Sequence, residues 1–241
     1  MEISKDIEII GLSLYLKRFK TLILTDFHMG FEETLNKQGI LVPRFQLDKT
    51  LKKLDKIFAL VKPETIIING DLKHEFSTIS ETEWLNTLKL VDYLLKKSKN
   101  LILNKGNHDT ILEPILKKRN LKINEYTKID DVYVTHGDKI PENKYFKDSK
   151  ITIIGNEHPA ITLKEESRRE TYKCFLKGKF ENKILIVQPS FNLVTKGTDI
   201  LREKLLSPFL HQDLSSFEVF IVGKEKVYNF GKLKNLKAQN Q

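Results

Sequence analysis

Short apolar runs that end in polar residues recur along this 241-residue chain. The runs are nearly continuous rather than alternating, which is typical of strands covered on both faces. A basic turn, Lys17–Lys20, separates the first two of them. We therefore expect strands over residues 7–16, 20–25, 65–69, 101–104, 121–125, 131–135, 151–154, 171–177, 183–188, 216–222 and 225–229.

Apolar residues at helical spacing predict an amphipathic helix over residues 45–60, which ends near Pro63. A second long helix is expected after Ser80, because Ser80 with Glu83 resembles a capping box. A short helix around residues 111–118 should be interrupted by Pro114. The apolar stripes of the two long helices are formed by Leu47, Leu51, Leu54 and Phe58, and by Trp84, Leu88, Val91 and Leu95.

The order of these elements predicts the fold class. Strands and helices alternate in the first half, whereas the second half is rich in strands, which suggests an α/β fold of two packed sheets flanked by helices. We find no repeat and no linker, so we expect a single domain over residues 1–241. The basic tail over residues 231–241 is expected to be frayed.

Composition indicates the cellular compartment of the protein more than its function. The net charge of +9 permits attraction to nucleic acid, although a solvated lysine-rich surface explains it equally well. Cys174 is the only cysteine, so no internal disulfide can form and we expect a buried thiol and a reducing compartment. The N-terminal segment has acidic residues inside its apolar region and does not read as a signal peptide, and no run approaches roughly 20 apolar residues, so we expect a cytoplasmic protein without membrane contact.

Candidate chemistry is concentrated where five of the apolar runs end. In open α/β sheets, ligands bind beyond the carboxyl ends of the strands, so residues at several such ends can share one cleft. Each histidine alone is more simply a hydrogen-bonded residue, but five of the six histidines lie in these five places. The candidates are Asp26 and His28, Asp71 and His74, Asn107 with His108 and Asp109, His136, and Asn156 with His158.

This mixture of donors favours a metal site. Carboxylate, imidazole and amide oxygen suit Mn²⁺, Fe or Zn²⁺, and they argue against a thiolate zinc site. Because there are more candidates than one ion needs, we expect two divalent metals about 3.5–4 Å apart that share a carboxylate. Such a pair activates water and stabilises charge during displacement at phosphorus.

The five blocks DFH, GDLKH, GNHD, VTHGD and GNEHP, in this order, resemble the signature of calcineurin-like metallophosphoesterases. The later segments YKCFLKG and QPSFNLVTKG resemble a subgroup of archaeal SbcD-related phosphoesterases and bacterial ligase-associated DNA-damage endonucleases. The resemblance covers about residues 8–225. It implies a two-sheet sandwich with helices outside, in agreement with the pattern above.

The resemblance also implies a role for each block. His108 would protonate the leaving oxygen, oriented by Asp109. His74 stands where nuclease members carry a histidine that helps the substrate step. Asp26, His28, Asp71 and His158 would hold the first metal, with Asp71 shared, and Asn107 and His136 would hold the second.

Asn156 departs from the family pattern, in which the last block begins Gly-His and that histidine completes the second metal shell. An amide oxygen is a harder and weaker ligand, so the second site should be looser or favour Mn²⁺ or Mg²⁺. Alternatively, water fills the position.

Arg44 and Lys73 are candidates to bind substrate phosphate, although each is equally well explained as a surface charge. We predict a metal-dependent phosphoesterase that hydrolyses phosphodiesters, with nucleic acid as the leading substrate class and Mn as the favoured metal. The alternatives are a phosphatase or small-nucleotide phosphodiesterase, and a scaffold that has lost catalysis. The sequence indicates no particular protein partner.

Overall fold

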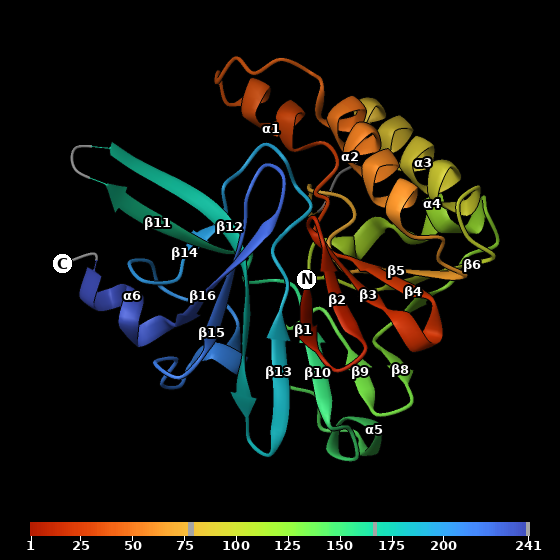
Figure 1. Cartoon of the computed structure of the whole chain (residues 1–241). Coiled ribbons are helices and arrows are strands. Elements are labelled where there is room, and N and C mark those ends of the chain that lie inside the picture. Colours follow the sequence, from red (N-terminus) through yellow and green to blue (C-terminus); the bar gives the residue numbers. More distant parts are fainter. Residues whose placement is uncertain (77–79, 166–167, 240–241) are drawn as a thin grey trace.

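Two β-sheets packed face to face, with helices on both outer faces, form the framework of the computed structural model (Figure 1). The structure describes residues 1–76, 80–165 and 168–239. The predicted fold class, a two-sheet sandwich flanked by helices, is confirmed. In the described residues, no helix is long and apolar enough to cross a membrane.

The first sheet is built from the N-terminal half of the chain. Its first four strands are antiparallel, whereas its last four are parallel. Parallel neighbours need crossover connections, and the helices of this half supply them. In sheet order the described strands are β1 (Glu2–Ser4), β2 (Ile7–Ile10), β3 (Ser13–Leu16), β4 (Thr21–Leu24), β5 (Thr65–Asn69), β6 (Asn100–Asn104) and β7 (Ile123–Asn124).

The second sheet comes from the C-terminal half, with a parallel centre formed by β9, β10 and β13. Its main path in the described residues is β14 (Thr198–Asp199), β11 (Pro159–Glu165), β12 (Arg168–Phe180), β13 (Lys183–Val187), β10 (Ile151–Ile154), β9 (Val132–Val134) and β8 (Thr127–Ile129). β15 (Glu218–Val222) pairs with β12, and β16 (Val227–Lys232) pairs with β15.

Aliphatic side chains fill the space between the sheets. Ile23 and Ile67 of the first sheet pack in one buried cluster with Val134 and Ile153 of the second. Since both sheets present such residues, their strands are apolar on both faces, as the near-continuous runs predicted.

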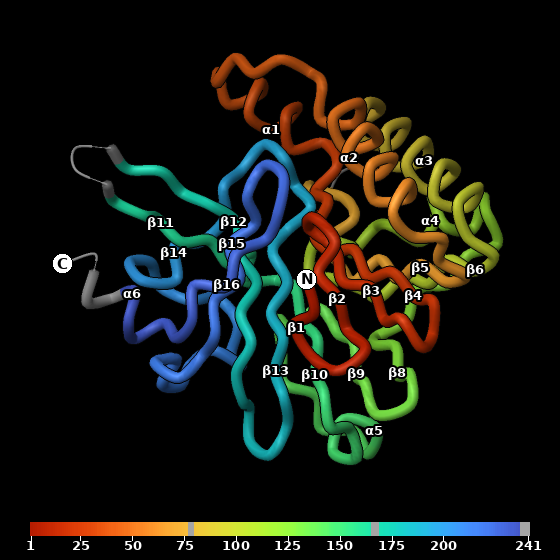
Figure 2. The backbone as a smooth tube through the Cα atoms, in the orientation of Figure 1, coloured from red at the N-terminus to blue at the C-terminus, as the bar shows by residue number. Residues whose placement is uncertain are grey.

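Helices cover the outer faces of the sandwich. α2 (Gln46–Leu60) and α3 (Glu81–Leu95) bury Leu54 and Leu90 against the first sheet, and Figure 2 shows the two helices running side by side. The remaining helices are α1 (Phe31–Lys37), α4 (Glu113–Lys117), α5 (Lys144–Lys147) and α6 (Leu233–Gln239), with 3-10 turns at η1 (Lys17–Phe19), η2 (Asp109–Ile111) and η3 (Pro208–Leu210).

Both long helices were predicted correctly, and Ser80 caps α3 by accepting a hydrogen bond from the Glu83 backbone N–H. Pro114 differs from expectation, because it lies in the first turn of α4 rather than interrupting a helix. A first-turn residue needs no intrahelical N–H bond, so proline is tolerated there.

The single strand predicted over residues 7–16 is wrong. β2 and β3 are separate antiparallel strands joined at Gly11, where φ is +62°. Glycine adopts this left-handed conformation without steric cost, and it lets the chain reverse within one apolar run. The apolar pattern concealed this turn because both strands are buried.

The prediction of a frayed tail is also wrong for residues 233–239, which form α6. Leu233 and Leu236 are buried in the cluster that covers the outer face of the second sheet. Residues 240–241 lie outside the described residues. No apolar run or helical spacing predicted β1, α1, β11 and β14, which are short or polar.

Replacing Leu233 with alanine tests whether α6 is packed in solution. Leu233 is 0% exposed, so Leu233→Ala should lower the free energy of unfolding by about 2–4 kcal/mol through lost burial and a cavity. The neighbouring Lys234→Ala, on the exposed side, should change it by less than about 0.5 kcal/mol. Urea denaturation measures both variants, and equal stabilities would show that the tail is frayed.

Candidate metal centre

The carboxyl ends of central strands from both sheets meet at one edge of the sandwich. The loop after β4 is hydrogen-bonded to the loop after β5, where Asp26 N donates to Gly70 O at 3.1 Å and His28 N donates to Asp71 O at 2.9 Å. The loop after β13 joins them, because Phe191 N donates to Thr25 O at 2.8 Å. These backbone bonds bring the polar blocks of distant segments together.

Four predicted metal ligands converge at this edge. Single donor atoms of Asp26, His28, Asp71 and His158 all lie within 4.8 Å of one another. His28 Nε2 is 3.3 Å from His158 Nε2 and 3.6 Å from Asp71 Oδ2. The family resemblance implied that these four residues hold the first metal, and the structure brings their donor atoms into one group.

Asp26 provides the test of whether this group suits a cation. Its Oδ2 accepts a hydrogen bond from the Thr25 hydroxyl at 2.7 Å. Its Oδ1 is buried and accepts no hydrogen bond within the part of the chain that the structure describes. The nearest imidazole nitrogens, His136 Nδ1 and His158 Nε2, lie 3.4 and 3.5 Å from Oδ1 without forming a hydrogen bond. A buried carboxylate oxygen without a hydrogen bond is costly, so the arrangement fits a metal ion that would bind this atom.

The protonation states of two members also suit metal binding, which requires neutral imidazole and ionised carboxylate. Burial lowers the pKa of His28 well below its ordinary value, and the neighbouring His158 lowers it further. Burial would raise the pKa of Asp71, but the charge of His136 and a hydrogen bond to it outweigh this effect and lower it. Burial would lower the pKa of His136, but Asp71 raises it to about 10, so His136 would have to release a proton to bind a metal.

A second group shares Asp71 with His136 and Asn107. His136 Nε2 is 3.4 Å from Asp71 Oδ2 and 3.0 Å from Asn107 Oδ1. Asp71 therefore lies between the two groups, as expected of a shared ligand. Asn156 directs its Nδ2 to Gly137 O at 3.5 Å, and its role as a ligand remains a prediction.

His74 and His108 lie beside the first group. Donor atoms of His28, His74 and His108 form a further cluster that could hold a metal, so these histidines have a ligand role as an alternative to the predicted catalytic one. Burial lowers the pKa of His74 to about 4, and the charge of His108 adds to this effect. His108 Nδ1 contacts the carbonyl oxygen of His74.

The resemblance implied that Asp109 orients His108, but the hydrogen bonds of the Asp109 carboxylate go to backbone groups. Its carboxylate accepts hydrogen bonds from the backbone of Gly106 at 3.0 Å and Leu72 at 3.1 Å. Burial raises the pKa of Asp109 to about 7, with a further contribution from the charge of Asp71. Asp109 thus ties two ligand loops together, whereas His108 is held by the His74 carbonyl.

Left-handed backbone is concentrated in these loops. Five candidate ligands have φ between +46° and +53°, a conformation that costs a non-glycine residue about 1–3 kcal/mol. Glycine also permits close approach, since a Cβ on Gly70 would lie 2.2 Å from His136 Nδ1. The five residues are Asp26, His28, Asp71, Asn156 and His158.

The two predicted phosphate-binding residues lie in different environments. Arg44 is exposed over 61% of its side chain and forms an ion pair with Glu33 at 2.8 Å. Lys73 is fully buried, and its Nζ has no hydrogen-bond partner among the described residues. The burial of Lys73 is incompatible with the alternative reading as a surface charge, while its role in binding substrate phosphate stays a prediction.

Several residues that sequence reasoning missed support the site. Gln46 donates to the carbonyl oxygens of Phe27 and His28 at 3.0 and 2.9 Å. Glu83 accepts from the backbone N–H of His74 at 2.8 Å, so the N-terminus of α3 fixes that loop. The Phe76 ring lies over His108, with ring centres 3.7 Å apart. Of these three residues, only Glu83 was indicated by the sequence, through its place in the capping box with Ser80.

Comparison with known proteins gives one family and a set of structural neighbours. A model of the calcineurin-like phosphoesterase family matches residues 19–209. The nuclease MPE of Pseudomonas putida has a TM-score of 0.66 at 18% identity, covering 93% of this chain and 94% of that chain. The phosphoesterase Yfce of E. coli has a TM-score of 0.43 at 12% identity, covering 88% and 97%. No curated protein matches the sequence.

At these identities, the structural likeness shows the fold alone. The family match is stronger, because residues 19–209 include all five strand-end blocks. The family resemblance drawn from the blocks is confirmed, while the SbcD-related and DNA-damage endonuclease subgroup stays a prediction. The chain belongs to the calcineurin-like phosphoesterase family.

Proposed function

We propose that this protein is a metal-dependent phosphodiesterase that acts on nucleic acid. The observation that carries the proposal is the convergence of Asp26, His28, Asp71 and His158 around the unpaired Asp26 Oδ1. The likeness to the P. putida nuclease MPE, the subgroup resemblance and the net charge of +9 favour nucleic acid over a small substrate.

Two divalent ions, Mn²⁺ in preference to Fe, Zn²⁺ or Mg²⁺, would lower the pKa of bound water and neutralise charge on the phosphoryl oxygens. The chain would hold them through the first group and through Asp71, Asn107 and His136, with Asn156 as a weaker fourth donor. Since Asp71 is common to both groups, its carboxylate would bridge them.

His108 is the residue that we assign to proton donation. Its Nδ1 faces the His74 carbonyl oxygen, which can only accept a hydrogen bond, so Nδ1 carries a proton. Nε2 is left to exchange a proton with the leaving oxygen. Its backbone N–H donates to Asp71 Oδ1 at 2.9 Å, so the acid is fixed directly to the shared carboxylate.

A phosphatase or small-nucleotide phosphodiesterase would use the same residues, and a scaffold would use none of them. Asn156 favours the scaffold, because it replaces an imidazole ligand of the family pattern. The other four blocks retain every expected donor, which favours catalysis.

A substrate panel separates these functions. With Mn²⁺, the protein should hydrolyse bis-p-nitrophenyl phosphate at least about tenfold faster than the monoester p-nitrophenyl phosphate, and it should cleave single- or double-stranded DNA. Product release is followed by absorbance and by gel electrophoresis. Fast monoester hydrolysis with intact DNA would indicate a phosphatase, and no hydrolysis at all would indicate a scaffold.

Replacing Asp71 with asparagine tests the shared ligand. The amide keeps the shape and the acceptor for His108 N but removes the charge, so metal affinity should fall at least about 100-fold. Isothermal titration with Mn²⁺ and diester hydrolysis should both decline. Asp148→Asn, an exposed carboxylate at the end of α5, is the matched control and should behave as wild type. Unchanged metal stoichiometry in Asp71→Asn would contradict the assignment.

His108→Asn distinguishes a proton donor from a metal ligand. Hydrolysis of a thymidine dinucleotide, which needs a protonated leaving oxygen, should slow about 100-fold or more. Hydrolysis of bis-p-nitrophenyl phosphate should change much less, because nitrophenolate leaves without a proton. His211→Asn, an exposed histidine outside the site, is the control. Equal losses on both substrates, together with lost metal, would instead make His108 a ligand.

A further inference from the structure

A groove with a volume of about 750 Å³ lies between α2, the end of β2 and the β15–β16 turn. Figure 2 shows these three segments next to one another near the centre of the view. None of the candidate metal ligands lines the groove. The loop after β13 separates the two sites, because Asn192 N is bonded to Asp26 O while Leu193 lines the groove.

The floor of the groove is aliphatic. No aromatic side chain lines it among the described residues, so it offers no platform on which a nucleobase could stack. Leu60, at the border of the groove, is 74% exposed, so its side chain is accessible to a ligand that enters the groove. The apolar lining includes Ile9, Ile57, Leu60, Val61, Leu193 and Val227.

Lysines stand on both walls of the groove. Those on α2 are spaced three to four residues apart, so they project from one side of the helix. Burial lowers the pKa of Lys53, and the charge of Lys56 adds to this effect. The six lysines are Lys49, Lys52, Lys53, Lys56, Lys224 and Lys226.

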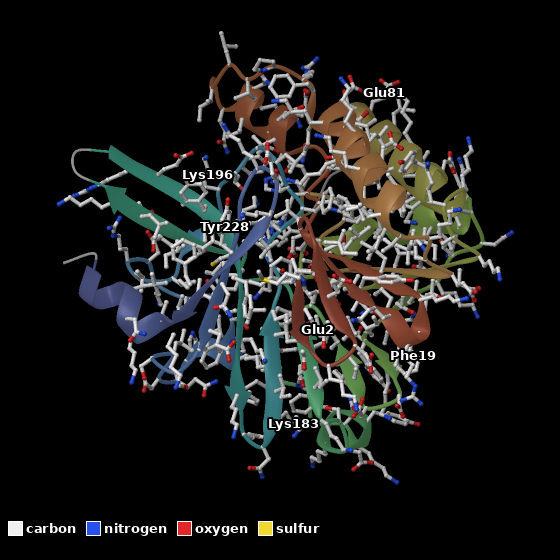
Figure 3. The ribbon with its side chains drawn as sticks, in the orientation of Figure 1. Glu2, Phe19, Glu81, Lys183, Lys196 and Tyr228 are labelled. Atoms are coloured by element: carbon white, nitrogen blue, oxygen red, sulfur yellow. The ribbon has the colours of Figure 1, made fainter. Side chains whose placement is uncertain are left out.

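These lysines are not neutralised by the protein itself. In the described ranges, none of the six forms an ion pair with a carboxylate. Lys49 and Lys226 instead lie over the rings of Phe45 and Tyr228, the latter marked on β16 in Figure 3. The lining contains two acids: Glu8 pairs with the N-terminal amine, and Glu225 offsets part of the positive charge of Lys224 and Lys226, so the lining keeps a positive net charge. An anionic ligand would therefore relieve repulsion among the lysines.

We propose that this groove docks an acidic segment of a partner protein whose aliphatic side chains enter the floor while its carboxylates meet the lysines on both walls. An aliphatic floor with charged borders is the arrangement that receives an amphipathic helix or short peptide. Charge complementarity selects an acidic segment, and the lack of aromatic side chains in the described lining disfavours a nucleic acid strand.

A displayed library of random peptides of about 12 residues, panned on the full-length metal-loaded protein, tests the proposal. Enriched peptides should carry a net negative charge and at least two aliphatic residues. Their affinity, measured by fluorescence anisotropy, should fall at least about tenfold in Lys52→Glu/Lys56→Glu and in Leu60→Glu. All three residues are exposed, so both variants should fold.

Lys147→Glu/Lys150→Glu makes the same charge change at exposed positions elsewhere and should bind the peptides as wild type does. Diester hydrolysis should be unaffected by every variant, which keeps this result separate from the proposed catalysis. The proposal is overturned if no peptides are enriched, or if enriched peptides bind all variants equally. It is also overturned if oligothymidylate displaces the peptides and loses affinity through the same substitutions, because the groove then holds nucleic acid.

Discussion

The burial of the Asp26 carboxylate where the two sheets meet is the constraint on which the rest of the site depends. Asp26 comes from the first sheet, and its Oδ1 lies 3.4 Å from His136 Nδ1 and 3.5 Å from His158 Nε2, which both follow strands of the second. A charged group without solvent needs compensation at close range. The sandwich places imidazoles of one sheet beside carboxylates of the other and leaves Oδ1 without a hydrogen bond, so the same packing that forms the fold also forms a site suited to a cation.

Much of this arrangement could be predicted from the sequence. Parallel strands place their carboxyl ends at one edge, so polar blocks following several apolar runs had to be near one another. The helical spacing of Leu54 and its apolar neighbours was sufficient to predict α2, and the Ser80 cap was sufficient to predict the start of α3. These features depend on local periodicity and on a general rule of topology.

Other features depend on contacts between distant residues, which a sequence does not display. The direction of a side chain in a tight loop is one example: Lys73 points inward, and Asp109 binds the backbone of Gly106 and Leu72 rather than orienting His108. The helical tail is another, because α6 buries Leu233 and Leu236 against the second sheet, which is far away in the sequence. Lysines spread over α2 and the β15–β16 turn likewise appear as one group only after folding.

The left-handed backbone of the strand-end loops links coordination to conformation. Asn, Asp and His are the non-glycine residues most enriched at positive φ, and the same three side chains carry oxygen or nitrogen donors. Each side chain thus meets two separate requirements at Asp26, His28, Asp71, Asn156 and His158. Replacing one of these residues with alanine or a β-branched residue would strain the loop backbone and would also remove a donor atom for a metal ion. Few other residue types can therefore occupy these positions.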